Sequence, residues 1–303
     1  MVYDAGLRKV IMFAGFDGTL SLDETWLYDP SGNTWKKREV DSEEDEEPPS
    51  AGPSAGGRIA AVYEPLTGRV VAFDGNTWAY DPGADEWKDL KPKGDRPSPR
   101  LGSCMAYDWA NGKAVLFGGT DMVTWFNDTW VYDPVVNKWT QMEATDDVPP
   151  GRSDYSMVYD AESKRMILFG GVANFSCFND TWAYDPRENT WLELTPAGET
   201  PSARCGHVMV YDPDQAQVIL FGGIDADFVR YNDTWAYDPL ANTWTDLMPP
   251  GESPLPRGRS AAAYVATIDK LVLFGGSGLQ EDPAGGYGTE VYFNDFWAFG
   301  KER

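Results

Sequence analysis

One eight-residue sequence, Asn-Asp-Thr-Trp-Ala-Tyr-Asp-Pro, occurs twice in the chain, at residues 179–186 and 232–239. Related sequences surround six tryptophans, which are Trp26, Trp78, Trp130, Trp182, Trp235 and Trp297. Successive members of this set are 52, 52, 52, 53 and 62 residues apart, and a second tryptophan follows each of the first five after nine residues. Repetition at such a period is typical of proteins built from copies of one structural unit. The chain therefore contains six copies of one unit.

Each copy is predicted to form four short β-strands. An apolar run that ends in glycine precedes the first tryptophan, and β-branched and aromatic residues alternate with turn residues. The Asp-Pro pair between the two tryptophans suits a type I turn, so these rings are predicted to face each other across a hairpin. A four-stranded sheet cannot bury both faces alone, whereas sheets packed face to face around an axis can. The sequence predicts an all-β, six-bladed β-propeller with tryptophans between the blades.

Several of these motifs resemble those of kelch repeats. They are the Gly-Gly after an apolar run, the spaced tyrosine and tryptophan, and unit starts such as Ser-Ala-Arg-Cys-Gly-His at 202–207. The resemblance covers nearly the whole chain and implies a kelch-type propeller, the fold also found in the central domain of galactose-oxidase-like proteins. The fold hosts many unrelated activities, so it does not by itself assign one.

We predict a single propeller domain over residues 1–303. Its repeat units span approximately 1–50, 51–98, 99–150, 151–202, 203–255 and 256–303. Trp297 has no second tryptophan nine residues later, so the last blade is predicted to lack its outer strand. Either the chain is part of a longer protein or the third strand of this blade is an open edge, which could pair with another chain.

Composition limits the possible partners. The formal net charge of −23 repels phosphate backbones and anionic lipid surfaces, which argues against nucleic acid as a partner. No apolar run approaches the roughly 20 residues of a membrane span, so no membrane insertion is expected. The first residues do not resemble a signal peptide. We expect a soluble chain, as a domain of a secreted or a cytoplasmic protein. Its three cysteines, without Cys-x-x-Cys spacing, are interpreted as structural thiols.

Six arginines lie just before the predicted first strands of the units. Four of them precede the first-strand tyrosine by seven residues, and two precede it by five; the set is Arg100, Arg152, Arg204, Arg257, Arg58 and Arg259. The first strand of a propeller blade lines the axis, so these arginines are predicted to surround one mouth of the channel. Guanidinium groups suit carboxylates and phosphates, and the resemblance to kelch adaptors implies that such arginines bind acidic peptides. The alternative is a structural role, in which each arginine joins loops through carbonyls or aspartates of adjacent blades.

Aromatic residues also occur in the predicted loops between the second and third strands. We consider Trp125, Phe175, Phe228 and Tyr287 as candidate binding residues, because exposed loop aromatics are common in binding surfaces. The alternative is that each ring packs back on its own blade.

The sequence contains little that suggests catalysis. A single histidine, His207, cannot supply the two or three imidazoles of a usual copper or zinc site, so galactose-oxidase-like metal chemistry is not expected. No catalytic or cofactor motif occurs, and we predict neither catalytic residues, nor a metal, nor a cofactor. The leading hypothesis is a recognition or scaffold module that binds a protein, peptide or glycan. Two alternatives remain: a sugar-processing enzyme, since kelch-type mutarotases use Arg and Glu at the axis, and a structural module of a larger surface protein.

Overall fold

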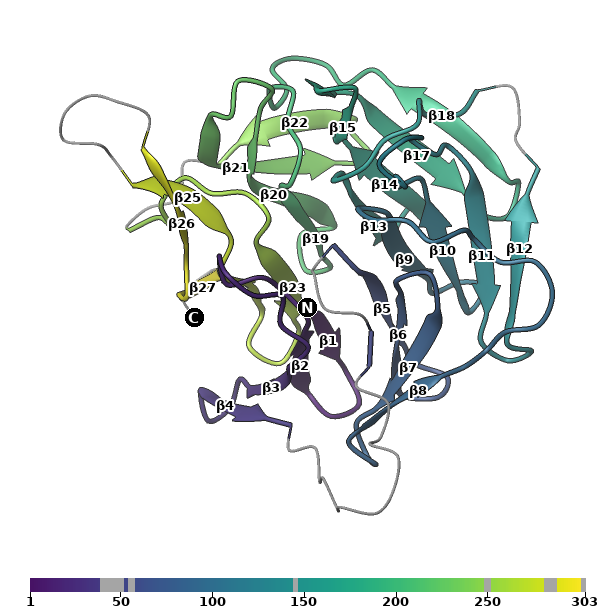
Figure 1. Ribbon diagram of the computed structural model, residues 1–303. Coiled ribbons are helices and arrows are strands. Elements are labelled where there is room, and N and C mark those ends of the chain that lie inside the picture. Colours follow the sequence, from purple (N-terminus) through teal and green to yellow (C-terminus); the bar gives the residue numbers. More distant parts are fainter. Residues whose placement is uncertain (39–51, 54–57, 144–146, 248–251, 281–287, 301–303) are drawn as a thin grey trace.

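Six antiparallel β-sheets are arranged in a ring in the computed structural model of the chain (Figure 1). The structure describes residues 1–38, 52–53, 58–143, 147–247, 252–280 and 288–300. Five sheets have four strands and the sixth has three, each in sequence order from the axis outward. The predicted all-β, six-bladed kelch-type propeller with a shorter last blade is confirmed.

The strands of the first three blades have the following bounds. Blade 1 contains β1 (Val2–Asp4), β2 (Lys9–Phe13), β3 (Thr25–Asp29) and β4 (Thr34–Lys37). Blade 2 contains β5 (Ala60–Glu64), β6 (Arg69–Phe73), β7 (Thr77–Asp81) and β8 (Glu86–Asp89). Blade 3 contains β9 (Cys104–Asp108), β10 (Lys113–Phe117), β11 (Thr129–Asp133) and β12 (Lys138–Met142).

Blade 4 contains β13 (Ser156–Asp160), β14 (Arg165–Phe169), β17 (Thr181–Asp185) and β18 (Thr190–Leu194). Blade 5 contains β19 (Val208–Asp212), β20 (Gln217–Ile224), β21 (Arg230–Asp238) and β22 (Thr243–Asp246). Blade 6 contains β23 (Ala261–Val265), β24 (Lys270–Phe274) and β27 (Phe296–Phe299). Among the described residues, β27 pairs only with β24, and strand addition by another chain at this edge stays a prediction.

The hydrophobic core is divided among the blade interfaces. Each of the six buried clusters found in the described residues combines residues of two neighbouring blades. The cluster between blades 6 and 1 contains Val10, Tyr28 and Val272. Packing of these apolar side chains therefore closes the ring, as the repeat architecture requires.

The second tryptophan of a unit joins its blade to the preceding one. The Trp191 ring packs on Phe117 of blade 3 with ring centroids 4.8 Å apart, and its Nε1–H donates to Thr129 Oγ1 at 3.0 Å. Three more joints have the same hydrogen bond, from Trp87 to Thr25, from Trp139 to Thr77, and from Trp244 to Thr181. Tryptophans are thus the contacts between blades, as the repeat predicted.

The predicted pairing of the two tryptophans across the hairpin is wrong. Trp191 lies opposite Tyr184, whereas Trp182 lies opposite Glu193. Asp185 pairs with Thr190, so the loop between them has four residues, two more than would place the tryptophans opposite each other. Its last residue, Asn189, has a left-handed conformation at φ 54 and accepts a hydrogen bond from the Tyr184 hydroxyl. The two extra residues shift the partner of Trp191 from Trp182 to Tyr184.

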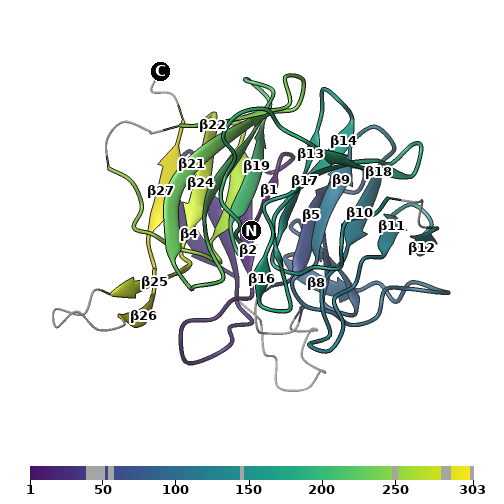
Figure 2. The same cartoon turned by 90° about the horizontal axis from the view of Figure 1, so that it is seen from above.

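Connections alternate between the two faces of the ring, because successive strands are antiparallel. One face carries the loops between the second and third strands of the blades and also the loops that lead into the inner strands. We call it the mouth face. Two small hairpins extend there, β15–β16 (Val172–Ala173 and Ser176–Cys177) in blade 4 and β25–β26 (Ser277–Gln280 and Thr289–Tyr292) in blade 6. In Figure 2 the labels β16, β25 and β26 lie on the same side of the ring.

Candidate binding site at the channel mouth

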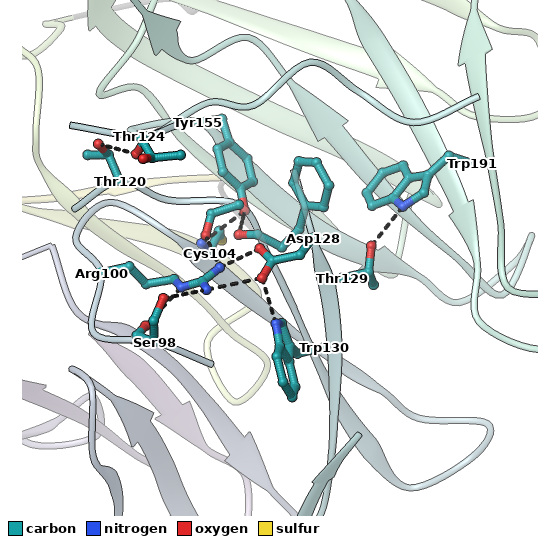
Figure 3. A network of polar contacts seen from close by, with 12 residues as sticks. Ser98, Arg100, Cys104, Thr120, Thr124, Asp128, Thr129, Trp130, Tyr155 and Trp191 are labelled. Atoms are coloured by element: carbon teal, nitrogen blue, oxygen red, sulfur yellow. Dashed lines mark hydrogen bonds and ion pairs between the residues drawn. The ribbon is translucent and has the colours of Figure 1, made fainter. Parts of the chain in front are cut away.

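Four of the six arginines are buried in ion pairs within their own blades. The side chain of Arg152 is fully buried, and its guanidinium forms two hydrogen bonds with Asp180, at 2.6 and 2.7 Å. It also donates to the carbonyl oxygens of Gly170 and Pro150, and it lies 4.1 Å from the centroid of the Phe178 ring. Equivalent pairs join Arg100 to Asp128, Arg204 to Asp233, and Arg257 to Asp295. Figure 3 shows Arg100 between Ser98 and Asp128, with Trp130 donating to the same carboxylate. We call these four groups the arginine clamps.

The backbones of three clamp arginines, Arg152, Arg204 and Arg257, join two blades. Arg204 N–H donates to Phe178 O of blade 4 at 3.0 Å, and Arg204 O accepts from Gly171 N–H of blade 4 at 2.9 Å. Gly170 and Gly171 both have positive φ values, and a Cβ atom on Gly170 would lie 2.7 Å from Arg204 O. The Gly-Gly of one blade is therefore required for the close approach of the next blade's arginine.

These contacts leave the clamp arginines few donors for a ligand. All five guanidinium N–H groups of Arg204 are accounted for by Ser202, Gly222 and Asp233. The alternative of a structural role matches this geometry, with one difference: the aspartate belongs to the arginine's own blade, and the link to the adjacent blade is made by the backbone. We do not include Arg100, Arg152, Arg204 and Arg257 in the proposed binding surface.

The other two arginines belong to a ring of residues at the axis. Five residues lie two positions after the clamp position in blades 2 to 6, namely Arg58, Gly102, Asp154, Gly206 and Arg259, and all have φ values between 54 and 64. Each of the last four donates its backbone N–H to the carbonyl of the one before it, at 3.3, 2.9, 2.7 and 2.6 Å. We call this set the mouth ring. Three of its members, Arg58, Asp154 and Arg259, line the cavity described below.

Arg58 and Arg259 are both exposed, unlike the clamp arginines. Arg58 Nη2 lies 3.2 Å from Asp154 Oδ2 across the small residue Gly102. A Cβ atom on Gly102 would lie 2.7 Å from Asp154 Oδ1, so glycine at this position leaves room for the ion pair. In the described part of the chain, the Arg259 side chain has neither an ion pair nor a hydrogen bond. Arg259 is therefore an exposed cation without such a partner among the described residues of a strongly acidic protein.

A cavity of about 1120 Å³ opens at the mouth ring. Its lining includes Arg58, Asp154 and Arg259 from the ring, Phe16 from blade 1, and Tyr292 from blade 6. The rings of Phe16 and Tyr292 contact each other at 5.4 Å in an edge-to-face arrangement. The cavity thus combines two guanidinium groups with an aromatic wall, a composition typical of a site for a ligand with an anionic group and an apolar part.

His207 also lines this cavity, and its surroundings favour the neutral imidazole. Burial and the neighbouring Arg204 lower the pKa of His207 to about 3. Its imidazole packs against the Phe169 ring with centroids 5.5 Å apart. The ring is therefore held neutral and packs against Phe169.

The loop aromatics divide into two kinds. Trp125 is half-buried and pairs through its backbone with Thr120, so it lies against its own blade. Phe175 is 90% exposed and Phe228 is 71% exposed. Tyr287 lies outside the described residues. Only Phe175 and Phe228 of the four candidates are therefore seen to present a ring to solvent.

Phe175 and Phe228 also have an unfavourable backbone conformation. Both have φ 63, and Met122 in the corresponding loop of blade 3, 72% exposed, has φ 75. Left-handed backbone is costly for residues with bulky side chains. Neither packing nor conformational preference therefore accounts for these residues at the tips of the loops, and such strain is concentrated at functional sites.

Two residues of the mouth face, Asp154 and Met122, were not identified as candidates from the sequence. Asp154 lies in the same frame as Arg58 and Arg259, two positions after the clamp, so an alignment of the six units would have found it. Met122 carries no such signal, because its exposure and its backbone conformation depend on the loop geometry.

The fold and the mouth face define a β-propeller whose loops carry the variable residues. Over residues 56–215 and 108–302 the chain matches the family described as the KLHDC2/KLHL20/DRC7 Kelch-repeats domain. The chain belongs to this kelch-repeat family.

Several curated proteins are similar to the chain. Kelch domain-containing protein 3 of Bos taurus is 29% identical over 229 residues, which are 70% of this chain and 56% of that protein. The N-(sulfonatooxy)prop-2-enimidothioate sulfolyase of Thlaspi arvense is 30% identical over 206 residues, 65% of this chain and 58% of the enzyme. The leucine-zipper-like transcriptional regulator 1 homolog of Drosophila melanogaster is 26% identical over 200 residues, 63% of this chain and 20% of that protein. The chain spans little more than half the length of the first two.

The described residues contain no helix that is long and apolar enough to cross a bilayer.

Proposed function

We propose that the chain is a non-catalytic recognition module that binds a protein, peptide or carbohydrate ligand through the mouth face. Arg58 and Arg259 are the proposed contacts for an anionic group, and Phe175 and Phe228 are the proposed contacts for apolar parts. Kelch propellers commonly bind proteins, and the combination of charge and exposed rings favours a peptide with a carboxylate beside an apolar residue.

One observation carries this proposal: the exposed rings of Phe175 and Phe228 lie on strained loop tips, on the same face as the two exposed arginines. Aromatic and arginine side chains are the residue types that dominate binding energy at interfaces. The negative charge of the rest of the protein favours binding of an acidic ligand at this site over other parts of the surface, because acidic ligands are attracted only where cations are exposed.

Selection of random peptides displayed on phage against the immobilised chain tests the proposal. We expect enriched peptides that combine Asp or Glu with an apolar residue. The double variant Arg58→Ala/Arg259→Ala should bind a selected peptide at least about tenfold more weakly, since charge-assisted hydrogen bonds are lost. Arg187→Ala is the matched control, because Arg187 is exposed in the turn between β17 and β18, on the opposite face. Equal binding by the double variant and the parent would contradict the proposal.

A sugar-processing enzyme is a second candidate, favoured by the Arg58–Asp154 pair in the cavity. A carboxylate beside a guanidinium in a concave site could hold an anionic sugar and move a proton. The Thlaspi arvense relative is named as an enzyme, so the family is not restricted to binding. Measurement of sialic acid mutarotation with the parent and with Asp154→Asn distinguishes this candidate. Catalysis that depends on Asp154 would support the enzyme and contradict the non-catalytic recognition module.

A further inference from the structure

Two of the three cysteines lie together on the mouth face although they belong to different blades. Cys177 is on β16, in the hairpin of blade 4, and Cys205 precedes β19 of blade 5. Both contact the carbonyl oxygen of Ile224: Cys177 Sγ at 3.7 Å and Cys205 N at 2.9 Å. Cys205 and Ile224 form an antiparallel bridge, which fixes the position of Cys205. The two thiols are close enough to be hydrogen-bond partners of each other.

The two thiols differ in ionisation. The hydrogen bond with Cys205 lowers the pKa of Cys177, although partial burial opposes this effect. The same hydrogen bond and burial raise the pKa of Cys205. The thiolate is the nucleophile in cysteine oxidation, so Cys177 is the residue suited to react first. It is also the more accessible of the two, since Cys205 is buried.

We propose that Cys177 and Cys205 are an oxidation site at which hydrogen peroxide joins blades 4 and 5 through a disulfide. The Cys177 thiolate attacks one peroxide oxygen, the O–O bond breaks, and hydroxide leaves and takes up a proton as water. The Cys205 sulfur then attacks the resulting sulfenic acid, the S–O bond breaks, and a second water leaves with the Cys205 proton. Two thiols and one hydrogen peroxide give one disulfide and two waters.

The disulfide would hold the Phe175 hairpin against the next blade. Residues 177–205 would form a covalent loop that includes β17 and β18, and the link would act in addition to the Trp244–Thr181 joint between the same two blades. A cross-link of this length stabilises the folded state chiefly by restricting the unfolded chain.

Mass spectrometry after oxidation of the folded chain tests the site. The parent is treated with hydrogen peroxide, alkylated, digested without reductant and searched for a linked peptide that has lost two hydrogens. We expect the Cys177–Cys205 link in the parent and in the control Cys104→Ser, and its absence in Cys177→Ser. Burial raises the pKa of Cys104 to about 11, which makes Cys104 the unreactive control.

The second readout is thermal. Oxidation should raise the Tm of the parent and of Cys104→Ser by about 5 °C, reversibly with dithiothreitol, and should leave that of Cys177→Ser unchanged. Sulfinic or sulfonic acid at Cys177 without a link, links only between molecules, or equal oxidation of Cys104 would each overturn the proposal. Cys177 is half-exposed, so its substitution tests the pair even if Cys205→Ser fails to fold. None of these results depends on the proposed ligand.

Discussion

Arg204 and Arg259 lie on the same face of the propeller, in the loops that lead into neighbouring inner strands, yet their surroundings differ. Arg204 is buried, donates all five guanidinium hydrogens within blade 5, and stacks 4.2 Å from the centroid of the Tyr231 ring. Arg259, two positions further along the repeat frame, is exposed at the edge of the cavity. The frame of the repeat, rather than the residue type, therefore decides whether an arginine on this face belongs to the scaffold or is free to contact a ligand.

Substitution of one arginine from each group should show the largest difference. Arg152→Ala removes the guanidinium partner of Asp180 and the donor to the buried carbonyl of Gly170, and we expect a loss of about 3–5 kcal/mol in the free energy of unfolding. Arg259→Ala should change it by less than about 0.5 kcal/mol, as for other exposed positions. Urea denaturation followed by tryptophan fluorescence measures both values. Similar losses of unfolding free energy in the two variants would contradict the distinction between structural clamp arginines and exposed mouth-ring arginines.

The propeller itself could be predicted from the sequence because its joints are repeated. Each unit carries the same tryptophan, threonine and apolar run, and six equal sheets leave few arrangements that bury all of them. The pairing partner of Trp191 could not be predicted in the same way, because the register depends on a four-residue loop, 186–189, that ends in the left-handed Asn189.

The roles of the arginines were only partly visible in the sequence. Units 3 to 6 each have both the clamp arginine and the aspartate of their Asp-Thr-Trp or Asp-Phe-Trp motif, whereas unit 1 has Glu24 and unit 2 has Asn76 in place of the aspartate. This joint occurrence was the available signal for four buried ion pairs. The exposure of Phe175 left no such signal, since it depends on where the β15–β16 hairpin ends.

The clamp in blade 6 should make stability depend on pH. Partial burial opposes ionisation of Asp295, but hydrogen bonds from Arg257 and Trp297 lower its pKa below the usual value. A lowered pKa in the folded state means that the unfolded chain binds the proton more readily, so this contribution is complete above about pH 4 and is lost as the pH falls through the folded pKa.

Asp295→Asn is the variant that tests this dependence. We expect it to be less stable than the parent by about 1–2 kcal/mol at pH 7, because a hydrogen bond to a charged group is weakened. The difference should narrow below about pH 4, where the parent loses the same charge. Urea titrations at pH 7, 5 and 3 measure the difference, and a value independent of pH would contradict the role of the ionised carboxylate.

The smallest expected effect on stability concerns two phenylalanines that lie three residues apart in one loop. Phe178 lies over the Arg152 guanidinium, whereas Phe175 is exposed and has φ 63. Phe178→Gly should destabilise the fold, because it removes a ring that packs on a buried cation. Phe175→Gly should leave the free energy of unfolding unchanged or raise it by less than about 1 kcal/mol, because glycine adopts a positive φ without strain. The same variant should weaken binding of a selected peptide. If Phe175→Gly lowers the free energy of unfolding, Phe175 has a structural role, as the clamp residues do. Blade 4 would then supply no exposed aromatic contact on the mouth face.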